Sequence, residues 1–325
     1  MESTAPSLLP NHPLGQEDQQ DKDSPIPLFI VGLQKSGTSL LSRCLQMDAA
    51  VSSPFKAEGH DFWGDVPPFT PTAYPTGTLY QAKGGKQGHL LEASDIDTTI
   101  TATVHGRWHS LPCLTPILLN KNPYNTLRLG WLRALFPQAR IVAMVRNPLA
   151  NTYSLAKKYL PHQGRGKAPE EGWWGVKPPQ WREIIQEDKL EQCARQWLTV
   201  NQHLLANAWH VDLYLTYEAF CQQPRLWLQR ILQLCQPHRV DPPPIVLPLQ
   251  NCDGEYLTGA RLRSNNRYFH ERGNLSLPAH TVTEFPPLTA EQTRRIEKLA
   301  WPLWQAFREI QKSKMPPEAI KKHTP

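Results

Sequence analysis

The sequence predicts an α/β protein with a single domain, in which helices flank a mainly parallel central sheet. Short apolar runs typical of buried strands alternate with segments of helical spacing along the chain, as in folds built from β-α-β units. The chain has 325 residues, 40% of them hydrophobic, and no charge run or flexible linker divides it. It is therefore long enough for one large packed domain. Its 32 prolines are about twice the ordinary number, which indicates long ordered loops.

Four short apolar runs, each bounded by polar residues, glycine or proline, are typical of buried strands. They are residues 27–31, 116–120, 140–145 and 212–217. Other segments predict helices because they carry apolar residues at helical spacing or capping residues at their start. These are residues 38–47, 123–136, 183–208, 226–235 and 290–312, the last with an expected kink at Pro302. Long irregular insertions are expected near residues 54–110, 160–182 and 238–288.

Composition sets the expected limits of the folded domain. Residues 1–24 are rich in Pro, Ser, Gln, Asp and Glu, so a disordered N-terminal tail is expected. The predicted domain covers residues 25–312, and residues 313–325 are expected to form a flexible C-terminal tail. The formal charge of +6 divides into −4 on residues 1–24 and +10 on the rest. A basic body favours nucleic acid, an anionic membrane surface or a phosphorylated ligand, and charge does not choose among them.

Hydropathy and cysteine spacing predict the cellular setting. The longest apolar run, residues 26–33, holds eight residues including a proline and a glycine, whereas a membrane span needs roughly 20. The first residues lack the basic and apolar regions of a signal peptide, so a cytoplasmic protein without a membrane span is expected. The six cysteines show no paired spacing and are predicted to be reduced core thiols, neither disulfides nor metal ligands.

The loop between the first strand and the first helix predicts a phosphate site. It reads Gly32-Leu33-Gln34-Lys35-Ser36-Gly37-Thr38-Ser39. A helix N-terminus offers backbone N–H donors, glycines let the backbone approach an anion, and Lys, Ser and Thr side chains complete the cradle. The spacing of the two glycines is that of an ATP-type P-loop, but the lysine expected after the second glycine has moved inside, to Lys35. A plain glycine-containing turn with a Ser/Thr cap is the alternative interpretation.

The strand at residues 140–145 ends at Arg146, where a nucleotide triphosphatase needs a carboxylate to hold Mg²⁺. A cation at this place suits a phosphate and repels a metal. Ser154 follows eight residues later, in the first turns of the next helix. The guanidinium and the hydroxyl can therefore surround one dianionic group, which Arg grips bidentately. Taken alone, Arg146 fits a structural ion pair equally well.

Together the two loops resemble the sulfotransferases that use 3′-phosphoadenosine 5′-phosphosulfate (PAPS). That family carries a Pro-Lys-Ser-Gly-Thr-Thr-like loop, here Gln34 to Ser39, and a strand ending in Arg with a Ser eight residues on. Three further segments are similar to parts of the bacterial, tyrosylprotein or related branches of the family. They are Asn120-Lys121-Asn122-Pro123, Trp174-Gly175-Val176-Lys177-Pro178-Pro179 and Tyr217-Glu218-Ala219-Phe220. The resemblance runs from about residue 27 to 224 and implies a fold like that of P-loop nucleotide triphosphatases.

The resemblance also implies a donor site that needs no metal, with PAPS as donor and adenosine 3′,5′-bisphosphate as product. Its implied donor-binding residues are Lys35, Ser36, Gly37, Thr38, Ser39, Arg146, Ser154 and Tyr217. Lys35 would act on the bridging oxygen and the 5′-phosphate, and Lys121 would stabilise the sulfuryl group during transfer. The acceptor would carry a hydroxyl or an amine on a carbohydrate, peptide or small molecule, and the sequence leaves its identity and the oligomeric state open.

Transfer to a hydroxyl or amine also needs a general base. Cytosolic small-molecule sulfotransferases carry a base histidine in the segment equivalent to residues 120–123, and this sequence has none there. The heparan-type and tyrosylprotein branches place a catalytic Glu after the first helix, a position that Glu58 matches. Glu58 is therefore the predicted base, with His60 as the alternative because of its pKa near 6.5, and Asp61 as a third candidate.

Other classes of function stay open at this point. A P-loop kinase with a displaced lysine is the alternative enzyme, and it would need Mg²⁺ and an acidic strand end. A non-catalytic nucleotide-binding protein would keep the loops and lack a working base. Nucleic acid is not an expected partner, because the basic residues are dispersed and the sequence contains no recognised nucleic-acid motif.

Overall fold

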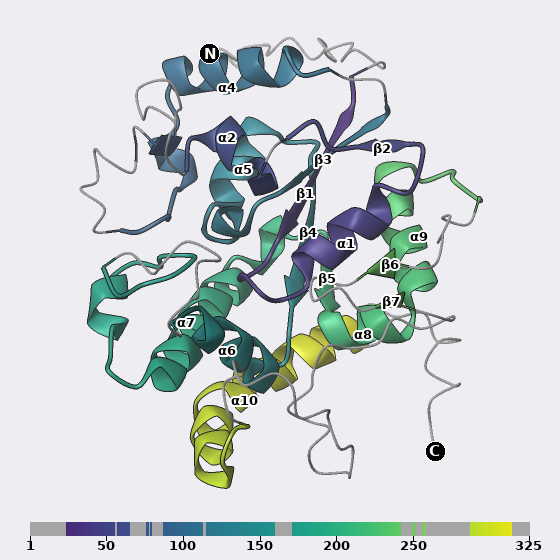
Figure 1. Ribbon diagram of the computed structural model, residues 1–325. Coiled ribbons are helices and arrows are strands. Elements are labelled where there is room, and N and C mark those ends of the chain that lie inside the picture. Colours follow the sequence, from purple (N-terminus) through teal and green to yellow (C-terminus); the bar gives the residue numbers. More distant parts are fainter. Residues whose placement is uncertain are drawn as a thin grey trace, which may run out of the picture.

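The computed structural model describes residues 24–55, 57–65, 76–77, 79, 87–112, 115–159, 171–241, 249–250, 256–257 and 287–313. Its centre is a five-stranded sheet in the order β2-β3-β1-β4-β5, and all neighbouring strands run parallel (Figure 1). The strands are β1 (Ile26–Val31), β2 (Val51–Ser52), β3 (Ile117–Lys121), β4 (Arg140–Val145) and β5 (Leu213–Thr216). Two short strands, β6 (Leu249–Gln250) and β7 (Tyr256–Leu257), pair separately and antiparallel. The predicted α/β class with a parallel sheet is confirmed.

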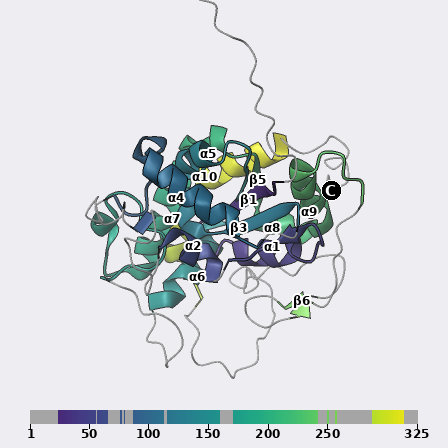
Figure 2. The same cartoon turned by 90° about the horizontal axis from the view of Figure 1, so that it is seen from above.

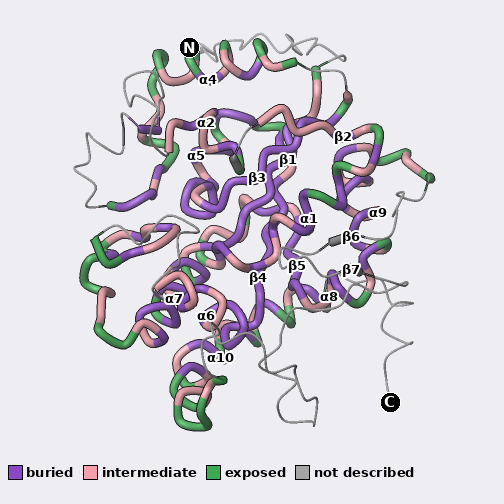
Figure 3. Tube along the Cα trace, in the orientation of Figure 1, coloured by how far each residue is buried: buried purple, intermediate pink, exposed green. Residues whose placement is uncertain are grey.

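Alternate residues of each central strand pack on opposite faces of the sheet, and both faces are buried (Figure 3). In β1, Leu28 and Ile30 point to one face while Phe29 and Val31 point to the other, all fully buried. This two-sided burial explains why the strands are continuous apolar runs in the sequence.

Helices cover both faces (Figure 2). One face packs against α1 (Thr38–Leu45), α8 (Tyr217–Gln222) and α9 (Pro224–Cys235). The other packs against α2 (His60–Trp63), α4 (Thr98–His109), α5 (Leu129–Leu135), α6 (Pro148–Ala156), α7 (Lys189–Ala206) and α10 (Ala290–Ser313). Aromatic rings fill much of this second face; the centroids of Phe62 and Trp63 lie 4.6 Å apart, and those of Trp63 and Trp131 5.3 Å apart. The Trp63 indole is therefore part of the hydrophobic core.

Several helix boundaries differ from the sequence expectation, two of them by more than a turn or in helix type. The helix expected from residue 183 begins at Lys189, because Asp188 caps it by accepting the N–H groups of Leu190 and Glu191 at 2.9 and 3.2 Å. Residue 183 lies instead in a separate 3₁₀ turn. The segment after Asn122 is also a 3₁₀ helix, Pro123–Leu127, and α5 follows it.

A capping box precedes α10, as its sequence Thr289-Ala290-Glu291-Gln292 indicates. Thr289 and Gln292 exchange hydrogen bonds of 2.9 and 3.1 Å between their side chains and backbone N–H groups.

Within the described ranges, no helix is long and apolar enough to cross a bilayer. Four cysteines are buried free thiols, namely Cys44, Cys193, Cys221 and Cys235. Burial raises the pKa of the Cys44 thiol to about 12, which makes it unreactive. Cys113 and Cys252 lie outside the described residues, as do both expected tails except for Ser24 and Ser313.

Candidate active site

The phosphate loop follows β1 at the carboxyl edge of the sheet, where parallel α/β folds bind ligands. Its first residue, Gly32, has φ of 145°, and a Cβ there would lie 2.3 Å from the carbonyl oxygen of Met144. Only glycine allows this close approach to the neighbouring strand. The N–H of Gly32 donates to the hydroxyl of Thr126 at 2.8 Å. The start of the loop is thus fixed against β4 and against the 3₁₀ helix after β3.

The end of the loop leaves polar groups for a ligand. Gly37 precedes α1 with φ of 101°, and no side chain caps the first amide groups of that helix. A Cβ on Gly37 would lie 2.3 Å from Cδ2 of Tyr217, so the predicted Tyr217 ring packs directly on the loop. The hydroxyl of Ser36 is buried and has no hydrogen-bond partner among the described residues. An uncapped helix N-terminus with an unpartnered hydroxyl is a site that fits an anion.

Arg146 lies against the same loop. Its guanidinium donates to the carbonyl oxygen of Lys35 at 2.8 Å and lies 4.7 Å from the centroid of the Tyr217 ring. Its own carbonyl oxygen accepts the indole N–H of Trp197 at 3.0 Å. The ends of β1, β4 and β5 therefore bring together three of the residues that the sequence predicts for donor binding, Lys35, Arg146 and Tyr217.

Ser154 lies on the helix that starts beside Arg146. Asn151 on this helix, α6, donates to the carbonyl oxygen of Gln34 at 2.8 Å, so that face of α6 turns toward the loop. Ser154 follows three residues later, and residues at this spacing share a helix face. The joint binding of one phosphate by Ser154 and Arg146 stays a prediction.

Lys121, Ser39 and Glu58 form one cluster at the end of β3. The ammonium of Lys121 makes an ion pair with Oε1 of Glu58 and donates to the hydroxyl of Ser39 at 3.1 Å. The Ser39 hydroxyl in turn donates to Oε1 of Glu58 at 3.3 Å. Lys121 is 8% exposed, whereas the Glu58 side chain is 40% exposed and open to an incoming molecule. The phosphate loop, the predicted sulfuryl-stabilising lysine and the predicted base therefore meet directly.

His60 joins this cluster through Glu58. Its Nε2 lies 3.7 Å from Oε2 of Glu58, and its ring packs on Tyr124 with centroids 4.8 Å apart. Burial raises the pKa of Glu58, but the interactions with His60 and Lys121 outweigh it and hold that pKa at about 2. Glu58 is ionised at neutral pH. The two alternative bases are neighbours, and Nδ1 of His60 is buried without a partner among the described residues.

The position of Glu58 relative to Lys121 is set by the residues next to each of them. Trp63 donates from its indole N–H to Oδ1 of Asn120 at 3.2 Å. A Cβ on Gly59 would lie 2.3 Å from Nδ2 of Asn120, so Gly59, with φ of 75°, lets the two segments touch. Because Gly59 follows Glu58 and Asn120 precedes Lys121, these contacts fix the positions of Glu58 and Lys121 relative to each other.

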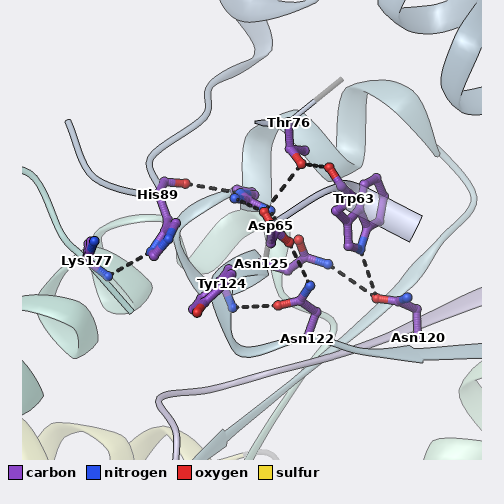
Figure 4. A network of polar contacts seen from close by, with 10 residues as sticks. Trp63, Asp65, Thr76, His89, Asn120, Asn122, Tyr124, Asn125 and Lys177 are labelled. Atoms are coloured by element: carbon purple, nitrogen blue, oxygen red, sulfur yellow. Dashed lines mark hydrogen bonds and ion pairs between the residues drawn. The ribbon is translucent and has the colours of Figure 1, made fainter. Parts of the chain in front are cut away.

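A buried ion pair between Arg128 and Asp65 belongs to the polar network shown in Figure 4. Arg128 binds both carboxylate oxygens of Asp65, at 2.6 and 3.1 Å, and Asn122 donates to the same carboxylate at 2.9 Å. Arg128 also donates to the carbonyl oxygen of His89 at 3.1 Å, and Nδ1 of His89 accepts the N–H of Lys177 at 2.9 Å. The network thus connects the end of β3 with two loops far away in sequence.

Sequence reasoning did not identify the role of Gln34, which stands where the family loop has proline. The Gln34 Oε1 accepts the N–H of Val176 at 3.0 Å, and a Cβ on Gly175 would lie 2.8 Å from that oxygen. The segment around Trp174 is therefore fastened to the phosphate loop. Lys158 was missed as well: its ammonium lies 5.2 Å from the centroid of the Trp174 ring. No motif marks these contacts, because they join residues up to 142 positions apart.

A model of the sulfotransferase family matches residues 27–239, which is more than half of the chain. The chain therefore belongs to the sulfotransferase family, an enzyme family that uses PAPS.

The solved structures to which the chain is similar include a sulfotransferase from Mycobacterium tuberculosis, with 17% identity and a TM-score of 0.38, over 65% of this chain and 67% of that one. The sulfotransferase domain of the Synechococcus olefin synthase has 18% identity and a TM-score of 0.39, over 88% of this chain and 98% of that one. No curated protein sequence matches the chain significantly.

Proposed function

We propose that this protein transfers a sulfuryl group from PAPS to a hydroxyl or amine of an acceptor. The observation that carries the proposal is the Lys121–Ser39–Glu58 cluster. In it, a residue of the phosphate loop contacts both a buried cation and an accessible carboxylate. Such a cluster supplies what sulfuryl transfer needs at one point: a donor site, a group that neutralises charge and a proton acceptor.

The donor-binding residues suit the two ends of PAPS. The amide groups at the start of α1, with Lys35 and the buried hydroxyl of Ser36, fit the 5′-phosphosulfate. Arg146 and Ser154 fit the 3′-phosphate, and the Tyr217 ring, packed between Gly37 and Arg146, offers a surface near the adenine. When bound, PAPS supplies the sulfuryl group, and these residues hold and orient it.

The proposed reaction is a displacement at sulfur. A bond forms between the acceptor oxygen or nitrogen and sulfur, while the bond between sulfur and the bridging oxygen breaks. The acceptor proton passes to Glu58, and the electron pair of the broken bond stays on the 5′-phosphate of adenosine 3′,5′-bisphosphate. Lys35 neutralises charge at that leaving oxygen, and Lys121 faces the sulfuryl oxygens.

Lys121 has two roles in this proposal. Paired with Lys121, Glu58 has a pKa of about 2 and is a weak proton acceptor. When Lys121 turns to the sulfuryl oxygens, the carboxylate keeps His60 but loses the other partner that lowers its pKa, so that pKa rises above about 2. Glu58 is then a stronger base when the donor is present.

A phosphotransferase is the competing enzyme class, and the strand ends argue against it. A P-loop kinase holds Mg²⁺ with a carboxylate at the end of a neighbouring strand. Here β4 is followed by Arg146, whose guanidinium contacts the loop backbone. A cation at that place favours a second phosphate over a metal ion.

The test of the proposed function begins with ligand-dependent melting. Adenosine 3′,5′-bisphosphate without metal is expected to raise the Tm of the protein, because a ligand that binds the native state stabilises it. Lys35→Ala and Arg146→Ala are expected to abolish that rise. Glu58→Gln is expected to keep it and to lose sulfuryl transfer from labelled PAPS to a panel of hydroxyl and amine acceptors. A rise with ATP and Mg²⁺ only would refute the proposal in favour of a kinase.

A further inference from the structure

Lys158 extends the helix face that lies on the phosphate loop. It belongs to the 3₁₀ turn Lys157–Tyr159, which continues α6. Asn151, Ser154 and Lys158 follow one another at intervals of three and four residues, so they line up on one side. Asn151 touches the loop at Gln34. Because long side chains on a helix point back toward its N-terminus, the ammonium of Lys158 is directed toward the loop.

The ring of Trp174 fixes that direction. The ammonium of Lys158 lies 5.2 Å from the ring centroid, in a cation–π contact. The N–H of Trp174 donates to the hydroxyl of Tyr159 at 2.9 Å, and two residues later Val176 is bonded to Gln34. Lys158 is thus connected to the residue before Lys35 along two routes, through α6 and through the Trp174 segment.

The charges around Lys158 are unbalanced. Among the described residues, neither Lys158 nor Lys35, the basic residue of the loop, has an acidic partner. Burial, and then the positive charge of Lys35, lower the pKa of Lys158. The positive charges of Lys158 and Lys35 repel each other unless an anion lies between them.

We infer that Lys158 binds a phosphate group of the nucleotide donor, as a second lysine beside Lys35 that the Trp174 ring holds in place. The inference rests on the proposed function and deepens it, because it adds a donor-binding residue outside the two sequence signatures. It also gives the Trp174 segment a role, namely to fix a cation over the donor site.

Lys158→Gln tests the inference, with Lys157→Gln as the matched control. The neighbouring Lys157 ammonium lies 5.0 Å from the centroid of the Tyr153 ring and so belongs to another contact. Titration calorimetry with adenosine 3′,5′-bisphosphate is expected to show affinity roughly tenfold weaker for Lys158→Gln, the usual scale of a lost charge-assisted bond. Lys157→Gln should bind like wild type.

Binding of adenosine 5′-monophosphate shows which phosphate of the donor Lys158 contacts. If Lys158→Gln weakens the monophosphate and the bisphosphate alike, Lys158 binds the 5′-phosphate; if it weakens only the bisphosphate, Lys158 binds the 3′-phosphate. Unchanged affinity of Lys158→Gln for both nucleotides, with wild type binding normally, would overturn this inference alone. Failure of wild type to bind either nucleotide would refute the proposed function as well.

A pH profile separates a phosphate contact from a structural role. Because its pKa lies below the ordinary value of 10.5, Lys158 loses its proton earlier than other lysines as the pH rises. Wild-type affinity for the bisphosphate is therefore expected to fall at alkaline pH. Lys158→Arg, which stays charged, should bind and show a flatter profile. An Arg variant with the wild-type profile would contradict the inference.

Discussion

At the residue scale, Glu58 has a strained backbone and several partners for its carboxylate. Its φ of 67° places a non-glycine residue in the left-handed region, at a cost of about 1–2 kcal/mol. Strain of this kind persists only where the surroundings hold it, and it is common at functional sites. Here the ion pair with Lys121 and the Ser39 hydroxyl hold the carboxylate. The same contacts make the stability of the protein depend on the ionisation of Glu58.

The direction of that dependence follows from the pKa. Glu58 has a pKa of about 2 in the folded protein against an ordinary 4.5, so its ionised form stabilises the fold above pH 4.5. This contribution is lost as the pH falls through the window from about 5 to about 2. Wild type is expected to be more stable than Glu58→Gln at neutral pH, by less than about 1 kcal/mol because the carboxylate is partly exposed. Urea unfolding of both proteins at decreasing pH should show that the difference between their free energies of unfolding becomes smaller.

Lys121→Met supplies the control for Glu58. In that background the effect of Glu58→Gln on stability should vary less between neutral and acidic pH than it does in wild type, because one of the two partners that lower the Glu58 pKa is gone and His60 remains. A difference between wild type and Glu58→Gln that stays constant over the whole pH range would show that the ion pair does not set the ionisation of Glu58.

At the element scale, the Asp65–Arg128 ion pair joins the loop that carries Glu58 to the segment that follows β3. The two side chains are 2% and 1% exposed, and both carboxylate oxygens are bonded to the guanidinium. Removing one partner leaves the other buried and uncompensated. Asp65→Asn is therefore expected to lower the free energy of unfolding by about 3 kcal/mol or more, measured by urea unfolding.

Glu171→Gln is the matched control for Asp65→Asn. Glu171 pairs with Arg182 at 2.9 Å, but these side chains are 60% and 52% exposed. Breaking this pair should cost less than about 1 kcal/mol. Equal effects of the two substitutions would mean that burial does not decide the strength of the Asp65–Arg128 pair.

The arrangement of the strands and loops also explains which features of the fold and of the site the sequence predicts. The apolar runs predicted the strands because both faces of a central parallel sheet are buried, and adjacent parallel strands bring Lys35, Arg146 and Tyr217 to one edge. Contacts between loops leave no such pattern: the Gln34 bond to Val176 joins residues 142 positions apart. The start of α7 was misplaced because the polar stretch before Asp188 also carries spaced apolar residues, and only the cap at Asp188 fixes the boundary.

At the scale of the whole molecule, α10 belongs to the core although it lies beyond residue 239, where the family match ends. Trp304 and Phe307 are 4% and 1% exposed, and the ring centroids of Phe307 and Tyr214 lie 5.6 Å apart. The side chain of Gln311 accepts the buried N–H of Thr216, in β5, at 2.7 Å. The helix therefore covers the edge of the sheet at β5 and satisfies a backbone donor there.

We propose on this basis that the sheet and α10 unfold as one unit within the expected domain of residues 25–312. Phe307→Ala is expected to lower the free energy of unfolding by about 3–5 kcal/mol, because it removes a buried ring from the contact with Tyr214. Arg308→Ala, on the exposed side of the same helix, should change it by less than about 0.5 kcal/mol. Urea unfolding followed by tryptophan fluorescence and by circular dichroism should give coincident transitions for all three proteins. If α10 were a separate unit, Phe307→Ala would split the transition into two and leave the midpoint of the sheet unchanged.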